Sequence, residues 1–283
     1  MNYFIINPIS GSHDQRKKKQ LLSLIKSYPE NIVFETKCKN DEIELTQKAI
    51  KLGANKIIAV GGDGTINKVA SVLIETDIPM GIIPMGSGNG LARHLKIPLT
   101  VEKALNNAMH GKHIKIDACS INDKYSFCTS GIGFDALVAD IFEKRKKRGL
   151  INYIIAVIIA LMKYEPIEAK VNSGPTEKIF LLTISNANQY GNNAYISPNA
   201  DIQDGQFEII KIRNIGKLKL AMIALRLFSK SIHRSQDVEI VTGNNATIEL
   251  MGKQLLHLDG DITSSEYNNL TIKAKHRVLI VTA

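Results

Sequence analysis

Two patterns of hydrophobic positions alternate along the first 110 residues. Short apolar runs rich in isoleucine and valine are typical of buried parallel strands, and we predict four, over residues 3–6, 32–34, 56–60 and 79–83. Between these runs, apolar residues recur at three- and four-residue spacing, as in Ile66, Val69 and Leu73, which predicts helices. Strands and helices that alternate with short loops predict an α/β domain with a doubly wound parallel sheet over residues 1–111.

The pattern changes near Gly111. Beyond it, hydrophobic and polar residues mostly alternate, starting with a hairpin of residues 114–117 and 125–128. We predict further strands at 167–172, 178–185, 207–213, 236–241, 246–250, 254–258, 269–273 and 278–282. Helices are predicted at 135–147, 150–163 and 217–229. Residues 112–283 should therefore form a mainly antiparallel β-sandwich, with an active site in the cleft between the domains. The last strand of this second domain could return to the first.

A glycine-rich turn, Gly61-Gly62-Asp63-Gly64-Thr65, joins a predicted strand to the helix after it. In an open α/β sheet, ligands bind at the carboxyl ends of the strands, where this turn lies. Glycines let backbone N–H groups approach a phosphate, and a helix N-terminus attracts anions. The turn therefore predicts a phosphate site. The alternative is a plain strand-to-helix turn with Asp63 or Thr65 as N-cap.

A second glycine-rich turn, Gly86-Ser87-Gly88-Asn89-Gly90, follows the fourth predicted strand. Because both turns lie at carboxyl ends of strands in one sheet, they can bind one ligand between them. Asp63 adds a specific requirement, since a carboxylate repels phosphate unless a cation or a reacting hydroxyl lies between them. It therefore favours phosphoryl transfer or Mg²⁺ over passive binding.

The chain length and the net charge limit the number of domains and the classes of binding partner. The chain has 283 residues, enough for two domains, and a net charge of +9. This excess favours an anionic membrane, nucleic acid or phosphorylated small molecules. The basic run 143–148 is either a solvated helix end or a membrane-docking segment. The apolar helix after it is too short to span a bilayer, and we expect it in the core or in a lipid pocket.

Cysteine usage and the N-terminus bear on the compartment. Cys38, Cys119 and Cys128 are odd in number and lack metal-ligand spacing, which predicts reduced thiols. No signal peptide precedes the first predicted strand. We therefore expect a cytoplasmic protein that associates peripherally with a membrane. Because edge strands can pair, a homodimer is also an expectation.

Four segments together resemble the diacylglycerol kinase and sphingosine kinase superfamily, in its bacterial form. Turn 61–65 followed by Asn67 is similar to the family's nucleotide loop, which NAD kinases and phosphofructokinases also carry. Residues 7–11 resemble its opening N-P-x-S-G signature. Residues 86–92 are similar to its G-[ST]-x-N segment, in a form closer to sphingosine kinases. The similar segments follow the family's order along nearly the whole chain.

The resemblance implies an ATP site in the first domain. The nucleotide-binding residues that it implies are Asn7, Thr36, Gly61, Gly62, Asp63, Gly64, Thr65, Asn67 and Ser87. Mg²⁺ would bridge the phosphates of ATP, and Asp63 would help to position the metal or the acceptor.

The resemblance also implies a structural Mg²⁺ site in the second domain. Residues 198–205 are similar to the family's P-x-A-x-x-x-D-G segment, whose Asp binds the metal together with flanking carbonyls. Here Asp204 would supply the carboxylate, and Asp201 and Gln206 would supply backbone carbonyls. Oxygen ligands of this kind suit a hard cation. Without the resemblance, the segment predicts only an Asp-Gly hairpin turn.

Asp261 stands where the family's D-G-E motif has its catalytic glutamate. The segment Leu258-Asp259-Gly260-Asp261 keeps the carboxylate on an arm shorter by one methylene. Misplacement of a catalytic group by about 1 Å can cost about 100-fold in rate. The backbone must compensate, or the base is Asp63 or a water molecule. We predict Asp261 as the base.

These features together predict an ATP-dependent lipid kinase that acts at an anionic membrane surface on diacylglycerol or a sphingoid base. One alternative is an NAD kinase-type phosphotransferase, although the N-E dipeptide that such enzymes use for NAD is not found downstream. The other is a non-catalytic binder of anionic lipid or nucleic acid. We expect no nucleic-acid partner, because tryptophan is absent and no aromatic platform is visible.

Overall fold

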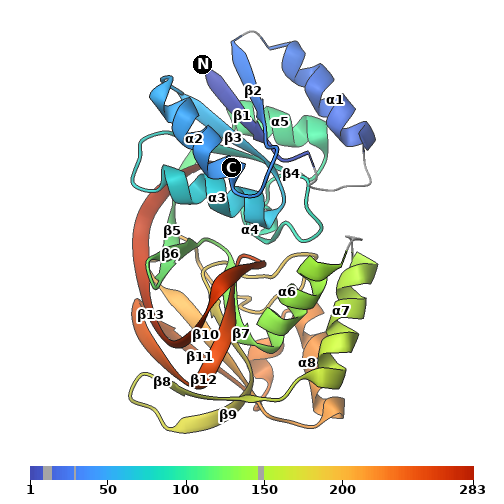
Figure 1. Cartoon of the computed structure of the whole chain (residues 1–283), viewed down its shortest axis with the longest axis vertical. Coiled ribbons are helices and arrows are strands. Elements are labelled where there is room, and N and C mark those ends of the chain that lie inside the picture. The colour runs from blue at the N-terminus through green and yellow to red at the C-terminus, as the bar shows by residue number, and fades with distance from the viewer. Residues whose placement is uncertain (9–14, 29, 146–149) are drawn as a thin grey trace. The chain divides into compact units, whose positions relative to one another are not determined.

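The computed structural model describes residues 1–8, 15–28, 30–145 and 150–283 (Figure 1). It divides into unit 1, residues 1–116 and 277–283, and unit 2, residues 117–276. Three parts of the sequence predictions lie outside the described residues. These are residues 9–11 of the opening signature, Pro29, where the sequence predicts the end of a helix, and residues 146–148 of the basic run.

Unit 1 is built on four parallel strands in the order β2-β1-β3-β4. Their bounds are Asn2–Ile6 for β1, Asn31–Glu35 for β2, Lys56–Gly61 for β3 and Met80–Pro84 for β4. Ile6 pairs with Glu35 and Val60, and Gly61 pairs with Pro84, so all four carboxyl ends meet at one edge. On the other side of β4, Val281 pairs with Met80, which brings the end of the chain into this sheet.

Five helices connect these strands: α1 (Gln15–Lys26), α2 (Asp41–Lys51), α3 (Asp63–Leu73), α4 (Gly90–His94) and α5 (Val101–His110). Phe4, Ile6, Ile58 and Val60 pack with α1 and α5 in one apolar cluster. The alternate residues of β1 and β3 are buried as well, and α2 and α3 contact these strands. Figure 1 shows α1 and α5 together on one side of the strands. Burial of both faces explains why these strands are continuous apolar runs.

The start of α2 differs from the capping box that its sequence predicts. Asp41 and Glu44 have the spacing of a capping box, but the N-cap is Asn40, in the left-handed region at φ 74°. Asp41 instead bonds the loop before it, where its Oδ2 accepts the N–H groups of Lys37 at 2.6 Å and Cys38 at 2.9 Å. With Asn40 as the N-cap at positive φ, Asp41 does not occupy the N-cap position of a capping box. Its carboxylate therefore caps the turn before the helix and not the helix itself.

Unit 2 is dominated by antiparallel strands. Those within it are β6 (Lys124–Ser126), β7 (Thr129–Gly133), β8 (Ile167–Val171), β9 (Thr176–Ser185), β10 (Phe207–Arg213), β11 (Val238–Gly243) and β12 (Asn245–Leu258). The strands β5 (His113–Ile121) and β13 (Asp261–Thr282) begin or end in unit 1. The pairing order is β11-β10-β9-β7-β12-β13, and β8 pairs with β9 and β12.

Three strands differ from the sequence predictions. The predicted strands 246–250 and 254–258 are one strand, β12, whose register shifts between Glu249 and Gln254 mark irregular pairing and not a turn. Likewise, 269–273 and 278–282 both lie within β13, which pairs with β12 as far as Lys273 and also pairs with β5. Strand β7 was missed, since its sequence Thr-Ser-Gly-Ile-Gly has little apolar pattern.

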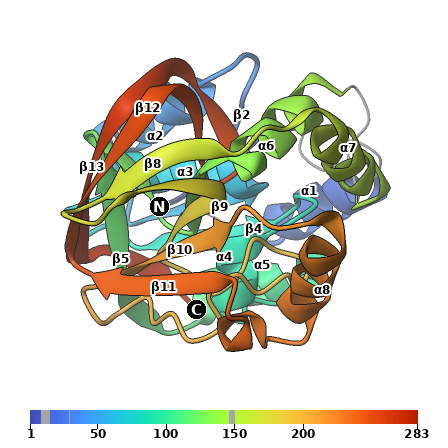
Figure 2. The ribbon, with the colours of Figure 1, turned by 90° about the horizontal axis from the view of Figure 1, so that it is seen from below.

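Three helices pack on the strands of unit 2: α6 (Phe134–Lys144), α7 (Leu150–Lys163) and α8 (Lys217–Phe228). A single turn of 3₁₀-helix, Ile232–Arg234, follows α8. All three α-helices contribute to one apolar cluster, and Figure 2 shows them along one side of the strands. From its apolar composition, helix α7 was expected in the core or in a lipid pocket, but only part of it is buried. Ala156 and Ala160 are fully buried, but Ile151 and Met162 are exposed.

The packing of β4 against α5 gives a first prediction. A Cβ on Gly81 would lie 2.9 Å from both Ala108 Cβ and Ile58 Cγ1. We expect Gly81→Ala to lower the free energy of unfolding by about 1–3 kcal/mol through overpacking, measured by urea denaturation. Gly243→Ala is the matched control, since its Cβ would meet only Asn245 O at 3.7 Å. Equal effects of the two variants would contradict the packing argument.

Candidate active site

Four loops of unit 1 carry the predicted nucleotide residues to one edge of the sheet. Asn7 follows β1, Thr36 follows β2, turn 61–65 joins β3 to α3, and Ser87 follows β4. Backbone bonds continue the strand pairing into these loops: Asn7 N–H donates to Val60 O at 3.0 Å, and Thr36 N–H donates to Ile6 O at 2.9 Å. The residues that sequence analysis placed at strand ends are therefore neighbours along this edge.

The two glycine-rich turns meet backbone to backbone. A Cβ on Gly86 would lie 2.6 Å from Gly62 Cα, and a Cβ on Gly62 would lie 3.3 Å from Gly86 Cα. Met85 N–H also donates to Gly61 O at 2.7 Å. Only glycine at these two positions allows so close an approach, so the turns form one continuous element.

Asp63 links the two turns. It begins α3, and its Oδ2 and Oδ1 accept the backbone N–H groups of Asn89 and Gly90, each at 2.8 Å. Asn89 lies at φ 53°, and its side chain accepts Gly86 N–H and donates to Gly86 O, both at 2.9 Å. The Asp63 carboxylate therefore shapes the second turn.

Glu42 is a buried carboxylate at this edge that sequence analysis missed. It is 2% exposed, and its Oε1 accepts Asn7 Nδ2–H at 3.0 Å and lies 3.3 Å from Thr65 Oγ1. Asn7 Nδ2 lies 3.1 Å from the same hydroxyl, and Lys68 Nζ lies 3.9 Å from Glu42 Oε2. The signal was available, because residues 42, 46 and 49 fall on one helical face with Thr46 and Ala49 buried.

The remaining predicted residues of unit 1 lie close to the turns in the chain. Gly64 is in the first turn of α3, and Asn67 follows one turn later, where its Oδ1 lies 3.5 Å from Ser71 Oγ. Ser87 is half-buried between Gly86 and Asn89. Thr36 is buried, so little of its surface is open to a ligand.

The predicted metal residues Asp201, Asp204 and Gln206 lie in one exposed loop before β10. Asp204 Oδ1 accepts Gln206 N–H at 2.9 Å, and Asp201 Oδ1 accepts Gln203 N–H at 2.9 Å. The fully buried Asp117 supports the loop, since its Oδ2 accepts Gly205 N–H at 2.6 Å. His276 Nδ1 lies 3.0 Å from the other oxygen of Asp117.

The oxygen donors of this loop fit a hard cation such as Mg²⁺. Over the described part of the chain, no three His, Cys, Asp or Glu side chains are grouped so that they could hold a metal ion. A metal in this loop would therefore depend on the Asp204 carboxylate and on backbone carbonyls. Because Asp117 already fixes Gly205, the loop has a defined shape before any ion binds.

A buried anchor fixes the turn that bears Asp261. Asp259 and Gly260 have φ 49° and 90°, so the turn has positive φ at both central residues, which suits a tight hairpin. The Asp259 carboxylate, 6% exposed, accepts Ser126 Oγ–H at 2.7 Å. It also accepts three backbone N–H groups at 2.9–3.0 Å, from Phe127, Cys128 and Thr129. Asp261 itself is exposed at the start of β13.

A second buried group supports the same turn, and sequence analysis gave it no role. His257 Nδ1 accepts Gly260 N–H at 3.3 Å, and its Nε2 lies 3.3 Å from Asp135 Oδ2. Thr183 Oγ1 donates to the same Asp135 oxygen at 2.7 Å. Burial and the Asp135 carboxylate raise the pKa of Tyr190 well above its usual range, so its hydroxyl stays protonated beside them. No spacing in the sequence relates Asp135 to His257; only the pairing of β7 with β12 does.

Two family models match consecutive parts of this chain. The diacylglycerol kinase catalytic domain matches residues 2–121, and the YegS C-terminal NAD kinase beta sandwich-like domain matches residues 129–278. The chain belongs to the diacylglycerol kinase-like lipid kinase family. The resemblance inferred from the four sequence segments is thereby confirmed.

Curated relatives and a solved structure agree with membership in this family. A Mycobacterium tuberculosis protein named diacylglycerol kinase is 30% identical over 78% of this chain and 75% of its own length. An Enterobacter protein named "Probable lipid kinase YegS-like" is 29% identical over 83% and 80% of the two chains. The crystal structure of a diacylglycerol kinase from Bacillus anthracis covers 99% of this chain and 96% of its own, with a TM-score of 0.74 at 19% identity. That structure shows the diacylglycerol kinase-like fold.

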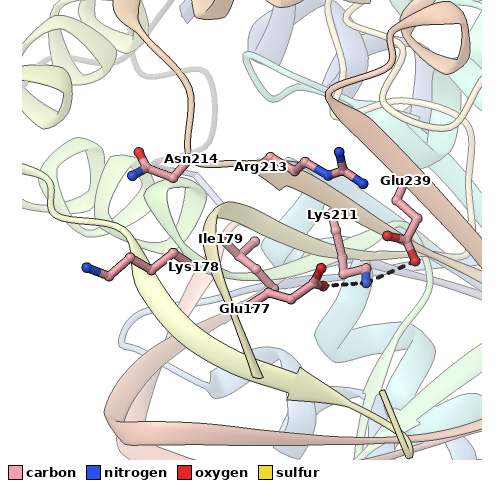
Figure 3. A pocket seen from close by; sticks show the side chains of 7 residues that line it. All are labelled: Glu177, Lys178, Ile179, Lys211, Arg213, Asn214 and Glu239. Carbon is pink, nitrogen blue, oxygen red and sulfur yellow. Dashed lines mark hydrogen bonds and ion pairs between the residues drawn. The ribbon is translucent and has the colours of Figure 1, made fainter. Parts of the chain in front are cut away.

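The described surface of this lipid kinase family member has a hollow of about 430 Å³ on unit 2 (Figure 3). Lys211 on β10 lies in it between Glu177 and Glu239, with both Nζ–Oε distances at 2.9 Å. None of the predicted nucleotide, metal or catalytic residues lines this hollow. We assign the ion triad to the stability of β9, β10 and β11. Separately, none of the helices described is long and apolar enough to cross a membrane.

The contrast between Asp259 and Asp261 gives a second prediction for this family member. Asp259→Asn keeps the side-chain shape and tolerates positive φ, but replaces an ionised acceptor by an amide whose NH₂ faces backbone donors. We expect the free energy of unfolding to fall by about 1.5–3 kcal/mol. Asp261→Asn, exposed and two residues away, should change it by less than about 0.5 kcal/mol. Chemical denaturation of both variants checks this, and equal stability losses would refute the anchoring role of Asp259.

Proposed function

We propose that this protein transfers the γ-phosphoryl group of ATP to the hydroxyl of a lipid of the diacylglycerol or sphingoid-base type. The observation that carries the proposal is the pair of glycine-rich turns joined through Asp63, in a chain that belongs to a lipid kinase family. The name of the Mycobacterium tuberculosis relative supports diacylglycerol as the first acceptor to test.

In the proposal, the carboxyl edge of the unit 1 sheet binds ATP. Backbone N–H groups of turns 61–65 and 86–90 face the phosphates, and the N-terminus of α3 adds its dipole. Asn7 and Thr65 are held in place by Glu42, which supports a role in orienting the nucleotide. Thr36, Asn67 and Ser87 complete the proposed nucleotide site.

Asp63 acts at the same place. Its bonds to the N–H groups of Asn89 and Gly90 support a role in holding the phosphate-binding turn. Mg²⁺ at the nucleotide, when bound, neutralises phosphate charge as the leaving group departs. A second Mg²⁺ in loop 201–206, held by Asp204 and the carbonyls of Asp201 and Gln206, would stabilise that loop.

Asp261 is the proposed general base. Its carboxylate takes the proton of the lipid hydroxyl while the hydroxyl oxygen bonds the γ-phosphorus and the bond from that phosphorus to the β-phosphate oxygen breaks. The products are a phosphorylated lipid and ADP. The tight anchoring of Asp259 and Gly260 supports this role, because it fixes the backbone that carries the shorter aspartate arm.

A kinase of the NAD kinase type is the second candidate. One observation favours it: the model that matches residues 129–278 describes an NAD kinase beta sandwich-like domain. Such an enzyme would phosphorylate NAD in buffer and would not need a lipid surface. NAD therefore belongs in the acceptor panel.

The decisive assay follows γ-labelled ATP with diacylglycerol, sphingosine, ceramide and NAD in mixed micelles. We expect a Mg²⁺-dependent phospholipid product that disappears when EDTA removes the metal. Asp261→Asn should lower the rate by about 100-fold or more, because the base is lost while the fold is kept. Transfer to NAD alone would move the protein to the second candidate.

Two variants distinguish the effect of losing the Asp261 carboxylate from the effect of the length of its side chain. Asp261→Glu restores the longer side chain and should retain activity, or exceed that of the wild type if the aspartate is too short. Wild-type rates from Asp261→Asn, in a folded protein, would exclude Asp261 as the base. If the protein binds lipid or RNA but transfers phosphate from ATP to none of these acceptors, the result would instead support a non-catalytic binder.

A further inference from the structure

Ten of the fourteen large apolar side chains that are exposed in the described parts of the chain lie on α7 and α8. Helix α7 exposes Ile151, Tyr153, Ile154, Ile158, Leu161 and Met162, and α8 exposes Leu218, Met222, Leu225 and Phe228. We name these ten side chains the α7/α8 face. Exposed apolar patches on this scale mark interaction sites more often than chance.

The usual distribution of side chains is reversed in α7. Its fully buried residues are the small Ala156 and Ala160, whereas the bulky Ile151 and Met162 are 74% and 79% exposed. On α8, Ile223 is buried, while Leu218 and Leu225 are 80% and 72% exposed. On each helix, four of the exposed residues recur every three or four positions and so form one stripe. They are Ile151, Ile154, Ile158 and Met162 on α7, and Leu218, Met222, Leu225 and Phe228 on α8. A helix that only needed to cover the core would have this pattern the other way round.

The two stripes belong to one region of unit 2. The inward residues of α7 and α8 join the same apolar cluster, and Figures 1 and 2 both place these helices on the same side of the unit 2 strands. Neither helix contains an acidic residue. The charged residues of the two helices are all basic: Lys163 on α7, and Lys217, Lys219 and Arg226 on α8. Lys163 is exposed, and Lys219 Nζ lies 3.2 Å from Asp237 Oδ1 outside the helix.

We infer that the α7/α8 face docks on an anionic phospholipid bilayer, with its apolar side chains in the interface and its lysines at the headgroups. Helices that carry bulky apolar residues and cations but no acids match this surface, because the apolar part partitions and each cation near the headgroups adds attraction. Helix α7 has 14 residues, about 21 Å, so it lies along the interface and does not cross a hydrocarbon core of about 30 Å. The inference rests on the proposed lipid substrate.

The test measures sedimentation of the full chain with phosphatidylcholine vesicles, with and without phosphatidylglycerol. We expect binding that requires phosphatidylglycerol and weakens with salt. Two double variants, Ile151→Gln with Met162→Gln and Leu218→Gln with Leu225→Gln, should each bind roughly tenfold more weakly or worse. The control, Leu52→Gln with Met251→Gln, removes two exposed apolar side chains that lie on neither helix and should bind like the wild type.

Activity on a short-chain diacylglycerol dissolved in buffer separates this inference from the proposed function. The surface variants should keep the wild-type rate on the soluble lipid and lose rate on lipid presented in vesicles. A wild type that binds vesicles but phosphorylates no lipid would refute the proposed kinase and leave the docking face standing. Equal vesicle binding by all variants would overturn the docking face. So would a dimer that the variants dissociate while vesicle binding is unchanged, because the face would then bind a second copy.

Discussion

The candidate nucleotide site depends on one contact, the approach of Gly62 and Gly86 backbone to backbone. The pairing of β3 with β4 brings the two turns together, since Gly61 pairs with Pro84 and Met85 N–H donates to Gly61 O. The Asp63 carboxylate holds the second turn through two backbone N–H groups, and Asn89 closes that turn on Gly86. The carboxylate therefore has a structural use before any metal or acceptor is present. This explains how a negative side chain persists in a turn whose other features attract anions.

In unit 2, an aspartate likewise holds a turn through backbone N–H groups, at residues 259–260. Asp259 is a buried carboxylate whose partners are three backbone N–H groups and a hydroxyl, and His257 bonds the next residue, Gly260. Such bonds to an ionised acceptor are strong, and they fix the backbone beside them. Asp261 then projects from a fixed frame. In each unit, an aspartate that accepts main-chain N–H groups fixes a turn that bears candidate site residues.

Most elements were predictable, because each followed from a local pattern. The glycine turns and the helices over 134–144, 150–163 and 217–228 have clear periodicity or turn residues. The misses came from tertiary pairing. Residues 261–282 continue as one strand across a polar stretch, and Asp135 meets His257 through strands distant in sequence. The α7/α8 face also escaped prediction, since an apolar helix gives no sign of which side it buries. The predicted roles of the site residues stay predictions.

Calorimetric titration of ATP with Mg²⁺ into the wild type and Gly86→Ala tests the central claim most directly. The added Cβ would lie 2.6 Å from Gly62 Cα, so the turns must separate while the rest of unit 1 keeps its contacts. The account predicts ATP binding by the wild type and a loss of roughly tenfold or more in the folded variant. Unchanged affinity in Gly86→Ala, or no ATP binding by the wild type, would contradict it.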